Sequence, residues 1–71
     1  MTVVRGWWNG QREQAAQRVL IHEQQGRWWV DHLGPRGLYE YVSCAGESQA
    51  RAEANRFLCR GSRWLALDLT P

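Results

Sequence analysis

Residues 27–44 decide the fold, and they read RWWVDHLGPRGLYEYVSC. Two segments rich in aromatic and β-branched residues, 27–33 and 38–44, flank the tetrapeptide Gly-Pro-Arg-Gly. Aromatic and β-branched side chains favour strands, and glycine and proline between two such runs favour a turn. The stretch therefore predicts an antiparallel hairpin in which successive side chains point to opposite faces of a sheet.

An amphipathic helix is predicted directly after the hairpin, from Ser48 to Arg60. Its apolar side chains recur at helical spacing on one side, at Ala50, Ala54, Phe57 and Leu58. The opposite side is polar and carries Gln49, Glu53, Arg56 and Arg60. Ser48 is the predicted N-cap, and Glu47 lies at the positive end of the helix dipole.

A further strand is predicted after the helix, over residues 63–69. Apolar and other residues alternate there, with Leu65, Leu67 and Leu69 on one side and Trp64, Ala66 and Asp68 on the other. We expect the leucine side to pack against the helix.

Residues 10–25 allow two interpretations. Good helix formers between Gly10 and Gly26 favour a second helix. The alternative is a strand over residues 18–24 that turns through Gln25 and Gly26 into the hairpin. Either way, residues 1–71 form one small α+β domain of two layers. Its antiparallel sheet has three strands, or four if residues 18–24 are extended, with one or two helices packed on it.

The tryptophan content is unusual for so short a chain. A chain of 71 residues buries roughly 60% of the surface that it exposes when unfolded. Five tryptophans alone represent roughly 750–1,250 Å² of surface. We therefore expect part of the aromatic surface to stay exposed.

The charge balance is mild. The formal net charge is +2, and all nine basic residues are arginine. Arginine stacks on rings and pairs with carboxylates or phosphates in a fixed two-pronged geometry. The chain has no run long enough to cross a membrane and no pattern typical of a signal peptide, so we expect a cytoplasmic protein without a membrane partner.

No motif points to catalysis, a metal or a cofactor. The two cysteines, Cys44 and Cys59, lack the spacing of a zinc site. A helix between them separates them by about 17 Å, too far for a disulfide, so two free thiols are expected. His22 and His32 have no nucleophile pattern beside them, and their structural interpretation is favoured. Phosphate-binding loops and paired carboxylates are also absent from the sequence, so we expect a protein that is not an enzyme.

The candidate site is an aromatic and arginine-rich sheet face opposite the helix. Strand alternation places Tyr39 and Tyr41 together, away from Leu38, Val42 and Cys44. The predicted partner-binding residues are Trp28, Trp29, Tyr39, Tyr41, Trp64, Arg27, Arg36 and Arg63, with one of the two adjacent tryptophans on the site's face. This face is either open or covered by residues 1–25. Arg56 and Arg60 on the helix are candidate contacts to phosphate or to an acidic partner, against the alternative of a solvated face with a Glu53–Arg56 ion pair.

These features predict a small binding module that regulates or inhibits a larger protein or nucleoprotein complex. Tryptophan, tyrosine and arginine dominate protein–protein hot spots, and they also stack and contact single-stranded nucleic acid. Glu40, Asp31 and Asp68 interrupt the strands with negative charge, which favours a protein partner over nucleic acid. A homodimer formed through the same face is a further alternative.

Overall fold

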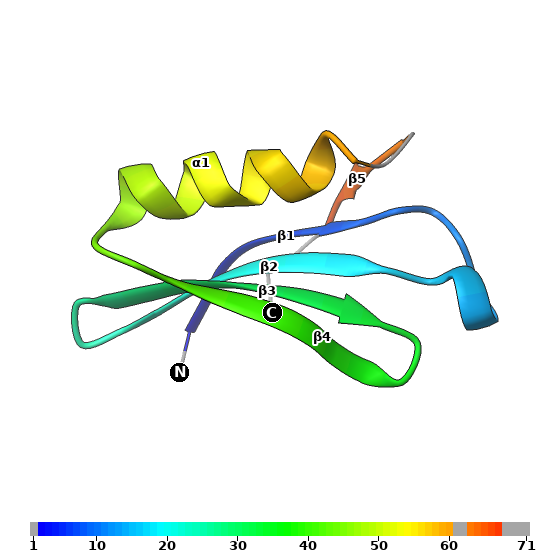
Figure 1. The fold of residues 1–71 in the computed structure, drawn as a ribbon, viewed down its shortest axis with the longest axis horizontal. Helices are drawn as coiled ribbons and strands as arrows, with labels where there is room; N and C mark the ends of the chain where they lie inside the picture. The colour runs from blue at the N-terminus through cyan, green and yellow to red at the C-terminus, as the bar shows by residue number, and fades with distance from the viewer. Residues whose placement is uncertain (1, 61–62, 68–71) are drawn as a thin grey trace.

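The computed structural model describes residues 2–60 and 63–67 of the chain. Its elements, in chain order, are β1 (Thr2–Trp8), the short 3-10 helix η1 (Glu13–Ala15), β2 (Arg18–Gln24), β3 (Arg27–Gly34), β4 (Gly37–Cys44), α1 (Glu47–Leu58) and β5 (Leu65–Ala66). The strands form one antiparallel sheet in the order β4-β3-β2-β1-β5, and α1 lies along one face of it (Figure 1). The α+β class is confirmed, but the sheet has five strands rather than three or four.

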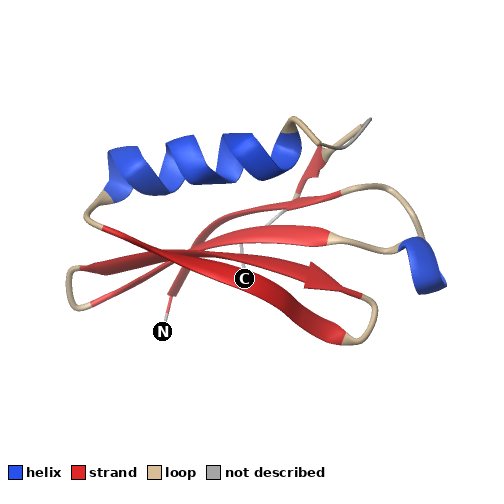
Figure 2. Cartoon of the chain, viewed as in Figure 1, coloured by secondary structure: helices blue, strands red, loops and turns tan. Residues whose placement is uncertain are grey.

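Residues 18–24, directly before the predicted hairpin, form a strand, as Figure 2 shows. The favoured second helix over residues 10–25 is therefore wrong, and the alternative strand over residues 18–24 is confirmed as β2. Val19 and Ile21 explain this outcome, because only an extended chain points both toward α1. Their exposed fractions are 0% and 1%. The helix-forming residues before β2 contribute only η1.

The turn between β2 and β3 is made by Gln25 and Gly26. Both have positive φ, 52° and 81°, which matches the two-residue hairpin turn whose twist suits the flanking strands. Gly26 meets this requirement without strain because it has no Cβ.

The predicted hairpin of residues 27–44 is confirmed, with one irregularity. The pairing of β3 with β4 shifts between His32 and Leu33, so that His32 pairs with Glu40 and Leu33 pairs with Leu38. Tyr39 is the extra residue of this β-bulge. The bulge changes the alternation of β4, so Leu38 lies on the same face as Tyr41 and the Tyr39 ring lies on the other face. The expectation that Tyr39 and Tyr41 share a face is therefore wrong.

Helix α1 supplies one wall of the core. Its buried residues are Ala50, Ala54 and Phe57, as predicted. The N-cap is Gly46 rather than the predicted Ser48, because the helix begins at Glu47. The small alanines let α1 approach the strands closely, where Val19, Ile21 and Val30 complete the core. Burying each of these three β-branched side chains contributes about 1.5–3 kcal/mol.

Strand β5 has the opposite phase to the one predicted. Trp64 packs against the core that α1 covers, whereas Leu65 pairs with Trp8 and is 48% exposed. The expectation that Leu65 and Leu67 face the helix is wrong because the larger indole takes that place. Leu69 and Asp68 lie outside the described residues.

Candidate binding face

One face of the sheet is covered by α1, and no described element covers the other (Figure 1). We call this second surface the uncovered face. Cross-strand pairs lie on the same face, so the register assigns residues to it. Its apolar members come from every strand or the residue after it: Val3, Trp8, Leu20, Trp29, Leu33, Leu38, Tyr41, Leu65 and Leu67. Residues 2–25 thus do not cover this face; they extend it through β1 and β2.

The centre of the uncovered face is closely packed around Gly6. A Cβ added to Gly6 would lie 2.8 Å from Cδ2 of Leu20 and 3.0 Å from Cδ1 of Leu67. The two leucine side chains therefore close over the glycine backbone. Leu20 lies on β2 and Leu67 follows β5, so the two side chains form an apolar cluster across β1.

Tyr41 and Leu38 are the most prominent side chains of this face. They are 60% and 53% exposed, and both belong to the edge strand β4. Beside them lies a hollow of about 760 Å³, which we call the Trp29 hollow; it is lined mainly by Arg27, Trp29, Asp31, Leu38, Tyr41 and Ser43. The small Ser43 is the cross-strand partner of Trp29, so it leaves the adjacent side of the indole open.

The other side of the Trp29 indole is occupied by His22. The two rings stack with their centroids 5.1 Å apart and their planes 10° from parallel. His22 is only 5% exposed, and its Nε2 lies 2.7 Å from Oδ2 of Asp31. Neither imidazole nitrogen is aligned for a directed hydrogen bond, so the contact with Asp31 is one of close approach. This stacking fixes the orientation of Trp29.

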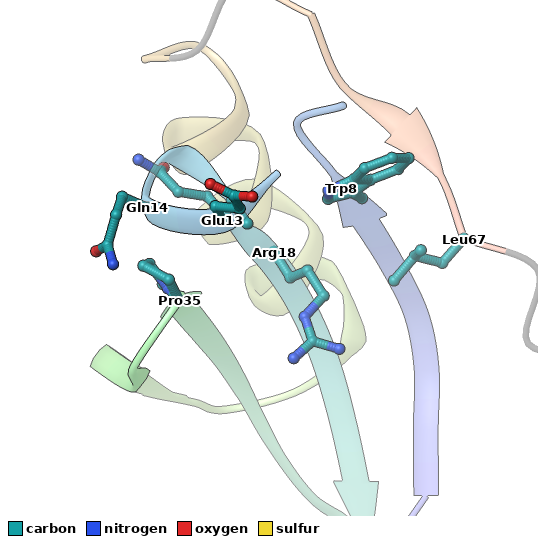
Figure 3. A pocket seen from close by; sticks show the side chains of 9 residues that line it. Trp8, Glu13, Gln14, Arg18, Pro35 and Leu67 are labelled. Atoms are coloured by element: carbon teal, nitrogen blue, oxygen red, sulfur yellow. The ribbon is translucent and has the colours of Figure 1, made fainter. Parts of the chain in front are cut away.

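A second hollow lies at the other end of the uncovered face. It has a volume of about 610 Å³ and is lined by residues that include Trp8, Glu13, Arg18, Pro35 and Leu67. Figure 3 shows Trp8 on β1 and Leu67 just after β5 at one side, Glu13, Gln14 and Pro35 at the other, and Arg18 between them. The Trp8 indole Nε1 donates to the carbonyl oxygen of Gln11 at 2.9 Å, which anchors the ring. We call this the Trp8 hollow.

The structure brings together only some of the predicted site residues. Trp29, Tyr41 and Arg27 share the Trp29 hollow. Trp28 and Trp64 pack against the core beneath α1, although Trp28 also borders the Trp29 hollow, and Tyr39 lies against His32 on the helix side. Arg36 is exposed in the β3–β4 turn, and the exposed Arg63 precedes β5. Trp8 and Leu38 are members of the face that the sequence did not indicate, because their orientation depends on the β1 pairing and on the bulge.

The helix side carries the arginine–carboxylate ion pairs of the described residues. Glu47 pairs with Arg51, Glu53 with Arg56, and Glu40 with Arg60, at N–O distances of 2.8, 3.3 and 3.5 Å. The predicted phosphate contacts Arg56 and Arg60 are thus both engaged. By contrast, Arg18 and Arg27 of the uncovered face have no carboxylate within ion-pair distance among the described residues.

His32 lies on the helix side in a structural environment. Its ring packs against Phe57 with centroids 5.2 Å apart, and Nε2 lies 3.1 Å from Oε1 of Gln17.

Within residues 2–60 and 63–67, no three His, Cys, Asp or Glu side chains are grouped to hold a metal ion. Cys44 and Cys59 are free thiols, as predicted. Burial, and secondarily the nearby Glu53 carboxylate, raises the pKa of the Cys44 thiol above its ordinary value.

Across the described residues, no helix has the length and apolar character required to cross a bilayer. The geometry of the uncovered face is the basis for a functional assignment, since comparison of the chain with protein-family models, curated proteins and solved structures gives no match.

Proposed function

We propose that this protein is a non-catalytic binding module that docks its uncovered face onto another protein. By occupying a surface of that protein, it regulates or inhibits a larger protein or nucleoprotein complex. The observation that supports this proposal is the exposure of Tyr41 and Leu38 beside the Trp29 hollow, on a face that no described element covers.

The distribution of apolar and charged residues on the uncovered face resembles that of a protein–protein interface. Such interfaces have an apolar centre depleted of charge and a polar rim, with tryptophan, tyrosine and arginine enriched. Here Leu20 and Trp29 belong to the inner strands, while Arg18 and Arg27 stand at strand ends. Asp31, the one carboxylate near the centre among the residues of 2–60 and 63–67, already faces His22.

Trp29 is suited to be a binding hot spot because its side chain is already oriented before a partner binds. Its stacking on His22 holds the indole in place, so less rotamer entropy is lost when a partner contacts the open side. A flat or branched apolar side chain of the partner fits the Trp29 hollow.

Single-stranded nucleic acid is a second candidate, favoured by the distribution of charge. Glu40, which the sequence predicted to interrupt the site, pairs with Arg60 on the helix side, while Arg18 and Arg27 of the uncovered face have no ion-pair partner in the part of the chain that the structure describes. The protein partner is still the better proposal, because much of the exposed apolar surface is aliphatic. Leu38 and Leu65 offer no ring on which a base can stack.

A capture experiment tests the proposal. Immobilised wild type, Tyr41→Ala and Leu38→Ala proteins are exposed to extract from the source cells, with and without nuclease. We expect wild type to retain a defined protein, both variants to lose most of it, and nuclease to have no effect. Arg51→Ala, on the outer side of α1, is the matched control and should bind like wild type.

Two results would contradict this assignment. Equal capture by wild type and both face variants would mean that the partner uses another surface. Capture that disappears after nuclease treatment and falls steeply with salt would identify nucleic acid as the ligand instead.

A further inference from the structure

We infer that a second copy of this chain packs against the uncovered face, so that two sheets meet face to face around a two-fold axis. This inference rests on the proposed function, because it names an occupant for the same surface. It starts from the strands, which carry large apolar side chains on both faces.

Strand β3 shows the pattern most clearly. Trp28 and Val30 contact the helix-side core, while Trp29 and Leu33 point to the uncovered face. On the same face, Arg27 precedes Trp29 and Asp31 lies between Trp29 and Leu33. Interfaces between separate chains mix apolar and polar side chains in this way. The uncovered face therefore has a composition that suits contact with a second chain.

The area of the face is sufficient for a stable dimer. Strands of seven, seven, eight, eight and two residues, at about 3.3 Å per residue and about 4.8 Å apart, cover roughly 500 Å². Two such faces bury roughly 1,000 Å² in total, which reaches the approximately 1,000 Å² expected of a specific interface. Sheets packed in this way form an interior about 10 Å thick from interdigitating side chains.

The protruding side chains of the face match the hollow of a second copy. Tyr41 and Leu38 protrude at the β4 edge directly beside the Trp29 hollow. In an isologous contact, a protruding side chain of each copy meets the recess of the other. A two-fold axis that crosses the strands between the Tyr41 and Trp29 positions lets the Tyr41 ring of each chain enter the Trp29 hollow of its partner, against the open side of the indole.

The charges do not oppose this arrangement. Arg18 and Arg27 stand at opposite ends of the sheet, where they form a solvated rim. The ion pairs of α1 lie on the other face and stay undisturbed. Because the dimer and any other protein use the same surface, the second copy competes with that protein, and binding capacity depends on the concentration of the chain.

Sedimentation equilibrium of the full chain from micromolar to submillimolar concentration tests this inference. We expect wild type to fit a monomer–dimer equilibrium. Leu38→Asp and Tyr41→Asp place a charge at positions that are already exposed in the single chain, so circular dichroism should be unchanged. Each should weaken the dimer at least about tenfold. Ser48→Asp adds the same charge at the start of α1 and should leave the dimer intact.

Every outcome has a distinct meaning. Wild type that stays monomeric at all concentrations overturns the second copy as occupant. A dimer that survives in both Asp variants overturns it as well, because the contact must then lie elsewhere, such as along the β4 edge. If the dimer is absent but Tyr41→Ala still abolishes capture of another protein, the proposed function stands and only this inference fails.

Discussion

The imidazole of His22 and the carboxylate of Asp31 approach to 2.7 Å on the uncovered face, although they belong to different strands and are not directly paired. Leu20 is the cross-strand partner of Asp31, and Trp29 is the partner of His22. The contact is thus diagonal, and diagonal neighbours on one face are within reach of long or aromatic side chains. It places a nearly buried polar group at the centre of an apolar surface.

Removing the carboxylate of Asp31 should therefore destabilise the fold. Asp31→Ala removes the carboxylate that lies 2.7 Å from the buried Nε2 of His22, so this nitrogen loses its close polar neighbour, and we expect a loss of about 1–3 kcal/mol in the free energy of unfolding, measured by urea denaturation. Glu47→Ala is the control, because it removes a carboxylate from an exposed ion pair and should cost less than about 1 kcal/mol. Equal losses in the two variants would show that the contact between Asp31 and His22 stabilises the fold no more than an exposed ion pair does.

The two faces should respond differently to truncation of an aliphatic side chain. Ile21→Ala opens a cavity beneath α1, where Ile21 is 1% exposed, and should cost about 2–5 kcal/mol. Leu38→Ala on the uncovered face should change stability by less than about 0.5 kcal/mol at concentrations where the chain is monomeric. A large loss for Leu38→Ala in dilute solution would mean that this side chain belongs to the core of the single chain.

The turn between β2 and β3 provides a backbone test. Gly26→Ala forces an alanine to a φ of 81° and should cost about 1–2 kcal/mol, lowering the melting temperature by several degrees. Gln25→Asn should raise the melting temperature, because asparagine accepts the positive φ of this position better. Gln24→Ala, just before the turn, is the control and should have little effect. A more stable Gly26→Ala protein would contradict the described turn.

The two thiols should react at different rates. Because thiolate is the reactive form, the raised pKa of Cys44 and its partial burial should slow its reaction with a disulfide reagent at mildly alkaline pH. The exposed Cys59 should react first, as the single-cysteine variants Cys44→Ser and Cys59→Ser would show. Adding Glu53→Gln to Cys59→Ser should accelerate the reaction of Cys44. Faster reaction of Cys44 than of Cys59 in the folded protein would contradict this environment.

The elements that the sequence predicts correctly are those stabilised by local patterns. Ala50, Ala54 and Phe57 repeat at helical spacing and become the buried stripe of α1. The hairpin of β3 and β4 follows from a turn flanked by two strand-forming runs, and the opposite orientation of Trp28 and Trp29 follows from alternation alone.

Long-range pairing decides the features that the sequence does not predict. Val19 and Ile21 become strand residues because β2 lies between β1 and β3, which local helix propensity does not reveal. The phase of β5 is ambiguous because both sides of that segment are apolar, so alternation does not say whether Trp64 or Leu65 faces α1. A single extra residue at Tyr39 then moves Leu38 to the candidate face.

The bulge at Tyr39 has a consequence for how molecules of this protein associate. Strand β4 is an outer strand of eight residues without proline, the kind of edge that recruits further strands and seeds fibrils. The extra residue breaks the regular spacing of its outward N–H and C=O groups, so an incoming strand finds an even template only beyond the bulge. The bulge thus opposes the pairing of a second chain along β4 and the lateral extension of the sheet, whereas the uncovered face stays accessible.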